Sequence, residues 1–127
     1  MLLVDTDIMV DFLRGYPPML AWLASVREEE LGLPGVVKLE LLNYAPDKDV
    51  VRRTRKAISP FVVYWPTPAD CERAVEVFAV AKLSHGMDPF DALIGETAVG
   101  MGVRLCTFNV KHFSAMPGLE TVQPYEK

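Results

Sequence analysis

Apolar residues along the chain follow two different spacings, one typical of strands and one typical of helices. The run "LLV" (2–4) is continuously apolar, which is typical of a short strand buried on both faces of a parallel sheet. From Thr6 onwards, apolar residues recur at helical spacing until Gly15, where the glycine ends the helix. The change of spacing therefore predicts a strand that is followed directly by a helix.

The same alternation continues along the rest of the chain. The expected strands are residues 2–4, 31–34, 61–65, 103–108 and 119–125. The expected helices are residues 6–14, 17–30, 35–45, 48–58, 67–86 and 88–102. Strands that alternate with helices predict an α/β fold with a mostly parallel sheet. Functional groups in such sheets gather beyond the carboxyl ends of the strands, which directs attention to Asp5 and to the segment that starts at Asn109.

Composition and charge narrow the class of protein. The 127 residues suit one domain, residues 1–127, and half of them are hydrophobic. No secretory signal and no apolar run long enough for a membrane span is expected, and Cys71 and Cys106 are typical of reduced core thiols, so we expect a cytoplasmic protein. The net charge of −4 argues against a general nucleic-acid coat. It does not argue against a nuclease, because bound cations invert the local field of an acidic site.

Three aspartates follow the first predicted strand. Asp5 suits two roles equally well, the N-cap of the next helix and a metal ligand at the edge of the sheet. Asp7 lies in the first helical turn, where an acid favours the helix dipole. Asp11 is one turn further on, and we expect it on a solvated face.

Glu40 lies between two leucines in the middle of an apolar helical segment, "VVKLELL". A glutamate in such a place is rarely left without a partner. Its partner is either an arginine or lysine elsewhere in the chain, or a metal ion, unless the carboxylate serves as a general base with a shifted pKa.

The segment "DPFDALIGETA" contains two further candidates. Asp88 is followed by a proline, which is the pattern of an N-cap with proline at the first helical position. Asp91 occupies the third helical position, where a capping-box acid also lies, but it begins an apolar run and is the better functional candidate. We expect Glu96 to fall off this face and to be exposed.

Asp5, Glu40 and Asp91 together describe three carboxylates on three separate elements that can converge at one edge of the sheet. Carboxylate oxygens without cysteine or histidine in ligand spacing suit hard cations such as Mg²⁺ or Mn²⁺. Such ions usually act on phosphates, so the expected reaction is metal-assisted hydrolysis of a phosphodiester.

The segments "LLVDTDIMVDFLRG", "VVKLELL" and "DPFDALIGETAVGMGVRLCTFNVKHF" resemble the PIN domain family, and more narrowly the VapC toxins of bacterial toxin–antitoxin pairs. The resemblance covers nearly the whole chain and implies a three-layer α/β/α domain with a short, mostly parallel central sheet. It identifies Asp5, followed by Thr6, as the first acid of the family's site, and Glu40 and Asp91 as the second and third. Asp7 occupies a position that varies among Asn, Asp and Ser in the family, where it supports the site indirectly.

The resemblance is incomplete after the strand "RLCT". Many family members have an acid where this chain has Asn109, and another Asp where it has His112. An amide brings no charge, so one bound ion is a safer expectation than two. The resemblance implies a Mg²⁺- or Mn²⁺-dependent endoribonuclease that is inhibited by a small cognate antitoxin of the VapB type, and a homodimer. Asn109 joins the three acids as a catalytic candidate, with Thr6, Asp7, Asp88 and His112 in support.

Basic residues concentrate in the segment "RRTRK". Its members Arg52, Arg53, Arg55 and Lys56 suit a solvated helix face or, with Arg14 near the first motif, contacts to RNA phosphates.

Two other functions remain open. A PIN-like protein that only binds RNA or a partner is compatible with Asn109, although it leaves the three costly carboxylates without a purpose. A hydrolase of the haloacid dehalogenase type also begins with Asp-x-Asp after a strand, but the residues that follow here, Ile8 and Met9, do not suit it. A dinucleotide-binding fold is excluded, since the first strand-to-helix turn has no glycine-rich loop.

Overall fold

Five short strands run parallel through the centre of the molecule. The computed structural model describes residues 1–27 and 30–127. The strands are β1 (Leu2–Val4), β2 (Leu31–Pro34), β3 (Val62–Tyr64), β4 (Arg104–Cys106) and β5 (Thr121–Val122), and their order in the sheet is β3-β2-β1-β4-β5. Every neighbouring pair is parallel. The expected α/β fold is confirmed, and all five expected strands are present.

Helices connect the strands. They are α1 (Thr6–Leu13), α2 (Pro17–Ser25), α3 (Gly35–Asn43), α4 (Lys48–Ile58), α5 (Pro68–Ser84), α6 (Pro89–Met101) and α7 (Val110–Phe113). The short helix α7 was not predicted, because four residues are too few to show a helical period. The second helix ends earlier than expected, since Val26 already has an extended backbone (φ −110°, ψ 157°). An acidic run opposes the dipole at a helix C-terminus, which disfavours a longer helix here. The expected helix (17–30) includes residues 28 and 29, which lie outside the described residues.

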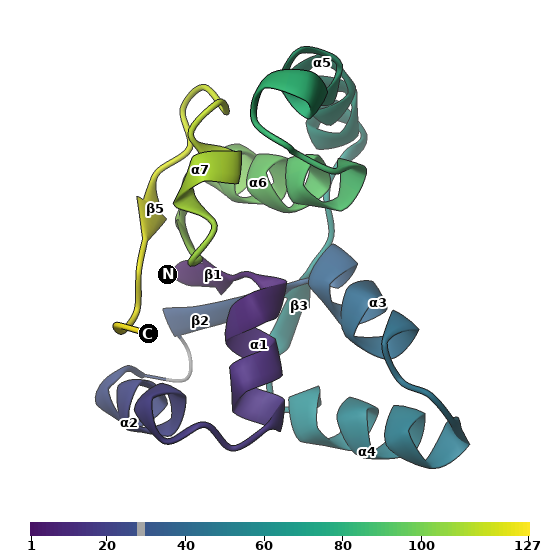
Figure 1. The fold of residues 1–127 in the computed structure, drawn as a ribbon, viewed down its shortest axis with the longest axis vertical. Helices are drawn as coiled ribbons and strands as arrows, with labels where there is room; N and C mark the ends of the chain where they lie inside the picture. Colours follow the sequence, from purple (N-terminus) through teal and green to yellow (C-terminus); the bar gives the residue numbers. More distant parts are fainter. Residues whose placement is uncertain (28–29) are drawn as a thin grey trace.

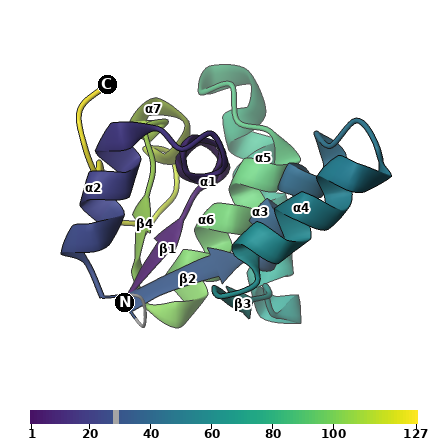
Figure 2. The ribbon, with the colours of Figure 1, turned by 90° about the horizontal axis from the view of Figure 1, so that it is seen from below.

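The helices form a layer on each side of the sheet. Figure 1 shows α5, α6 and α7 on one side and α1, α2 and α4 on the other, and Figure 2 shows β1 between β4 and β2. The chain moves outward from β1 to β2 and β3, and then crosses back to β4 on the other side of β1. The direction of the connections therefore reverses between β1 and β4, and ligands of open parallel sheets bind at the carboxyl ends beside such a reversal.

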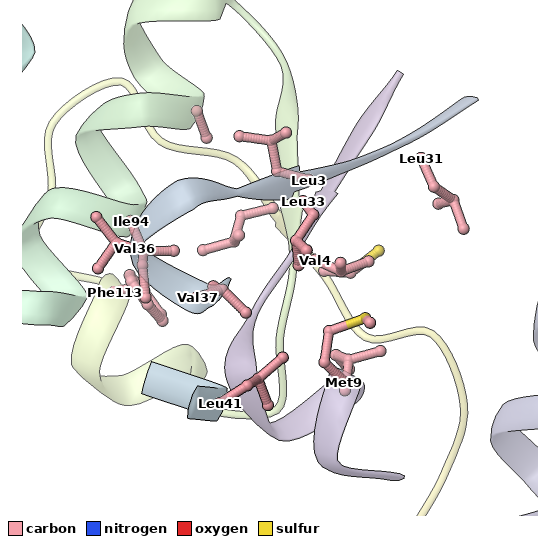
Figure 3. Packing of buried hydrophobic residues seen from close by; sticks show 14 of the residues in the cluster. Leu3, Val4, Met9, Leu31, Leu33, Val36, Val37, Leu41, Ile94 and Phe113 are labelled. Atoms are coloured by element: carbon pink, nitrogen blue, oxygen red, sulfur yellow. The ribbon is translucent and has the colours of Figure 1, made fainter. Parts of the chain in front are cut away.

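The core lies between the sheet and both helical layers (Figure 3). Leu3, Val4, Leu33 and Leu105 from three neighbouring strands are fully buried. The helices add further buried side chains, among them Met9, Val37, Ile94 and Phe113. Burial of this apolar surface on both sides of β1 holds the strand, and the residue that follows it, in one place.

Two glycines allow close approach near β2. A Cβ on Gly35 would lie 2.3 Å from the ring of Trp65, and a Cβ on Gly32 would lie 2.7 Å from the ring of Tyr64. Only glycine lets these aromatic rings pack directly on the backbone.

Neither cysteine forms a disulfide, as expected, and burial raises the pKa of the Cys106 thiol to about 12.

In the part of the chain that the structure describes, no helix has the length and the apolar surface needed to span a membrane.

Candidate active site

A pocket of about 330 Å³ opens at the carboxyl edge of the sheet. All eight residues proposed from the sequence as catalytic or supporting line it: Asp5, Thr6, Asp7, Glu40, Asp88, Asp91, Asn109 and His112. They come from the end of β1, from α1, α3 and α6, and from the segment after β4. The topology thus brings the separate motifs of the sequence to one place.

Asp5 is held at the reversal point of the sheet. Its backbone N–H donates to the carbonyl of Cys106 (2.9 Å), which ties the residue to β4. Its Oδ1 accepts the N–H of Thr6 (2.8 Å) and its Oδ2 accepts the hydroxyl of Thr107 (2.7 Å). Asp5 is therefore both an N-cap and a pocket carboxylate, so the two roles considered from the sequence coexist.

The environment of Asp5 favours its neutral form. The side chain is 3% exposed, and burial raises its pKa to about 7. The neighbouring charges of Asp7 and Asp91 add to the rise, while the hydrogen bonds from Thr107 and Thr6 oppose it. Part of the Asp5 population therefore keeps its proton at neutral pH in the metal-free protein.

Glu40 faces α1 across the pocket. Its Oε1 accepts the hydroxyl of Thr6 (2.9 Å), and no ion pair with an arginine or lysine is present among the described residues. Burial raises the pKa of Glu40; the charges of Asp88 and Asp91 contribute, and the bond from Thr6 opposes the shift. Glu40 is half-buried, and the simple explanation that an ion pair neutralises it does not apply among the described residues.

Asp88 and Asp91 form a reciprocal cap at the start of α6. Asp88 Oδ1 accepts the N–H of Asp91 (2.9 Å), and Asp91 Oδ2 accepts the N–H of Asp88 (3.3 Å). The expected N-cap role of Asp88 is confirmed. Asp91 completes the box as well, with its Oδ2 also 3.4 Å from Nδ1 of His112. Burial and the Asp88 charge raise the pKa of Asp91.

The segment after β4 is tied to α1 by short polar contacts. Asp7 accepts the N–H of Ile8 (2.9 Å) through one oxygen and the N–H of Phe108 (3.3 Å) through the other. Thr107 accepts the N–H of Asn109 (2.9 Å) while it donates to Asp5. These bonds position the exposed Asn109 at the pocket.

The role of Thr107 was missed in the sequence. The residue is fully buried, and its hydroxyl connects the strand end at β4 with the carboxylate at the end of β1. The signal available was its position directly after a buried strand, opposite Asp5 in the predicted sheet.

Relatives identify the fold family. A model of the PIN domain family matches residues 2–119. The chain belongs to the PIN domain family. This membership decides against the haloacid dehalogenase type of hydrolase.

Two curated relatives resemble this PIN domain over nearly its whole length. Ribonuclease VapC19 of Mycobacterium tuberculosis is 34% identical over 124 residues, which are 94% of this chain and 98% of the relative. Ribonuclease VapC10 of the same organism is 30% identical over 126 residues, which are 98% and 92% of the two chains. A chain in a solved toxin–antitoxin complex from Klebsiella pneumoniae is 27% identical, with a TM-score of 0.78 and complete coverage of both chains. The resemblance to the VapC group is confirmed.

The acidic side chains of this PIN domain suit a hydrated cation. Among the described residues, no group of three or more Asp, Glu, His or Cys side chains lies close enough together to hold a metal ion. Mg²⁺ usually keeps several of its waters and is held through one or two carboxylates. Burial raises the pKa of Asp5, the charges of Asp7 and Asp91 add to the rise, and a cation in the pocket would relieve the repulsion between these acids. The donor set therefore fits a hard dication that is bound partly through water.

Two polar side chains lie elsewhere than expected. Asp11, predicted on a solvated face, is 2% exposed because the C-terminal segment covers that face of α1 and Tyr125 donates to the carboxylate. Glu96, predicted to be exposed, is also 2% exposed because α5 packs over α6 and Arg73 Nε donates to it (3.1 Å). Both predictions were wrong, since each considered one helix without the segment that covers it.

The basic residues divide between the pocket and the surface of α4. Arg14 lines the acidic pocket. Arg53 lines a neighbouring groove of about 400 Å³, and both Arg52 and Arg53 pair with the exposed Asp49. The structure does not bring Arg52, Arg55 and Lys56 to the acidic pocket; all three are exposed on α4.

Proposed function

We propose that this PIN domain, residues 1–127, is a divalent-metal-dependent endoribonuclease of the toxin–antitoxin type. One observation carries the proposal: Asp5, Glu40 and Asp91 come from three separate elements and line one pocket, and among the described residues no arginine or lysine pairs with Glu40. The ribonuclease names of the two VapC relatives support RNA as the substrate. The Klebsiella complex supports inhibition by an antitoxin.

Asp5, Glu40 and Asp91 would hold one Mg²⁺ or Mn²⁺ ion. When bound, such an ion neutralises phosphate charge and lowers the pKa of a coordinated water. Two threonines act on the proposed ligands through hydrogen bonds. Thr6 orients Glu40, and Thr107 stabilises the ionised form of Asp5. Asn109 adds an uncharged amide that can donate to a phosphate oxygen or accept from a water.

The proposal includes partners. A VapB-type antitoxin would silence the enzyme until RNA cleavage is needed, and the domain would work as a homodimer in the cytoplasm, where cellular RNA is available. Exposed apolar side chains such as Trp65, Val80 and Leu83 leave surface for such contacts.

RNA cleavage by purified, antitoxin-free protein tests the proposal. Cleavage is expected with Mg²⁺ or Mn²⁺ and none with EDTA. Asp5→Asn and Asp91→Asn should each lower the rate by about two orders of magnitude or more, because each removes a charge from the metal site. Glu76→Gln is the matched control, since it neutralises an exposed carboxylate on α5.

Three outcomes would contradict the proposal in different ways. Equal cleavage by wild type and Asp5→Asn would point to a contaminating nuclease. RNA binding without cleavage, in protein that binds Mg²⁺ by calorimetry, would favour a binding-only PIN domain. If the protein neither binds Mg²⁺ nor cleaves RNA, the proposed metal site is contradicted. Calorimetry also measures stoichiometry, and one ion per chain is expected because Asn109 replaces an acid.

A further inference from the structure

Asp11 is a buried carboxylate with an unusual set of partners. It lies on α1, one turn after Asp7, and is 2% exposed. The hydroxyl of Tyr125 donates to its Oδ2 (2.6 Å), and Nζ of Lys127 lies 2.9 Å from the same oxygen. Nη1 of Arg14 lies 4.0 Å from its Oδ1. One buried acid thus holds two cations and anchors the segment that follows β5.

Two cations, Arg14 and Lys127, neighbour the Asp11 carboxylate. Burial alone would raise the pKa of Asp11, but the hydrogen bonds from Tyr125 and Lys127 and the charges of Lys127 and Arg14 outweigh it, and the pKa lies below its ordinary value. Asp11 is therefore ionised at neutral pH. Arg14 and Lys127 bring two positive charges to this part of the pocket, and Asp7 is a second acid within electrostatic range of Lys127.

Lys127 is held rather than free in solvent. Its Nζ lies 4.8 Å from the centre of the Phe108 ring and 5.9 Å from that of Tyr16. Tyr125 packs edge-on against Phe108 at 5.0 Å. An ammonium group that is already ordered by aromatic rings and a carboxylate loses little side-chain entropy when it binds a ligand.

Both cations face the candidate active site. Arg14 and Lys127 line the same pocket as the acids, and among the described residues they are its only arginine or lysine side chains. Figure 1 shows the segment after β5 running past the edge of the sheet towards α2. It carries Lys127 to the rim of the pocket, on the side formed by α1.

We propose that Arg14 and Lys127 bind a backbone phosphate of the RNA next to the phosphate that is cut, and that Asp11 and Tyr125 position Lys127 for this contact. This inference rests on the proposed ribonuclease function. A polyanion that enters an acidic pocket needs fixed positive charge beyond the metal ion, and phosphate contacts from lysine and arginine set the register of a nucleic acid. Lys127, held in place by Asp11 and Tyr125, supplies such a charge at the rim of the pocket together with Arg14.

RNA affinity in an inactive background tests the inference. Asp5→Asn protein is titrated against a fluorescein-labelled single-stranded RNA of mixed sequence, in Mg²⁺ and at several salt concentrations. Adding Lys127→Met should weaken binding roughly three- to ten-fold and lower the slope of log affinity against log salt by about 1. Lys127→Arg should retain most of the affinity, because it keeps the charge.

Two further variants make the result specific. Lys82→Met removes an exposed lysine on α5, outside the pocket lining, and should change neither affinity nor slope. Arg14→Met is expected to reduce the slope as Lys127→Met does. Because the Arg14 side chain is 69% exposed, this variant tests the same phosphate contact even if the loss of Lys127 destabilises the fold.

The outcomes separate this inference from the function on which it rests. If Lys127→Met and Arg14→Met leave affinity and salt slope unchanged while wild type cleaves RNA, the lysine serves only to neutralise Asp11, and the inference alone is overturned. If the Asp5→Asn parent binds no RNA and wild type cleaves none, the proposed function fails and the inference fails with it.

Discussion

At the scale of single residues, the Asp5 carboxyl group is poised between its two protonation states. Burial is the main reason, and the acids around it add to the effect, so that its pKa is about 7. Thr107 acts in the opposite direction, since its hydroxyl donates to the carboxylate and thereby favours the ionised form. The affinity of the pocket for a cation at neutral pH should therefore depend on a threonine that does not line the pocket.

Thr107→Val should make metal binding more dependent on pH. The substitution removes the donor and raises the pKa of Asp5 further above its ordinary value. We expect Mg²⁺ affinity to fall roughly three- to ten-fold near pH 7 and to recover above about pH 8.5, where Asp5 is ionised in both proteins. Titration calorimetry at both pH values measures this, with Thr107→Ser as the control that keeps the hydroxyl. An equal loss at both pH values would show that Thr107 acts through packing.

At the scale of elements, the pairing of α5 with α6 includes a buried polar network. Asp70 forms the capping box of α5 with Thr67 and also pairs with Arg73. Arg73 reaches across to the buried Glu96 on α6. A Cβ on Gly100 would lie 2.1 Å from Asp70 Oδ1, so the glycine leaves room for the aspartate on the neighbouring helix. Since Asp91 lies in the first turn of α6, the pairing also helps to place one side of the pocket.

Arg73→Met should destabilise the protein more than Arg73→Met combined with Glu96→Gln. The single variant leaves two buried carboxylates, Asp70 and Glu96, without their cation, whereas the double variant removes one of those charges. Thermal unfolding at neutral pH measures the difference, and we expect the single variant to lose several degrees of Tm and the double variant to regain part of the loss. Equal Tm values for Arg73→Met and wild type would show that the network contributes no net stability.

At the scale of the whole molecule, the fold brings several acidic side chains together at one edge of its sheet. Burial is the largest contribution to the raised pKa of Asp5, Asp7, Glu40 and Asp91. Folding therefore favours the protonated forms, and the folded protein binds more protons than the unfolded chain above the ordinary pKa of aspartate. Stability must then fall as the pH rises from about 4 through 7. Asp11 and Asp70 have lowered pKa values and affect stability only at more acidic pH.

Metal-free protein in EDTA should have a higher Tm at about pH 5.5 than at about pH 8. Asp5→Asn should flatten this dependence, because the residue with the pKa of about 7 no longer titrates. Mg²⁺ should stabilise the wild type mainly at the higher pH, by about 2.7 kcal/mol at a hundred times its Kd. Thermal scans with and without Mg²⁺ decide the matter. A Tm that rises with pH in EDTA would contradict the raised pKa values.

By itself, the sequence determined the local elements and the order in which the acids occur along the chain. In the part of the chain that the structure describes, apolar spacing identified all five strands and six of the seven helices, because each spacing reflects which residues face the core. The rule that functional groups gather at the carboxyl ends of parallel strands placed Asp5 beside the segment of Asn109 in advance, and the cap at Asp88 was visible from its proline.

Only the tertiary structure decided which polar side chains are buried and with what partners. Asp11 and Glu96 looked exposed on their own helices, but the segment after β5 and helix α5 cover them. Thr107 and Lys127 acquire their contacts with Asp5 and Asp11 across more than a hundred residues of sequence. Burial and charge interactions depend on distances between segments, and no periodicity within one segment contains those distances.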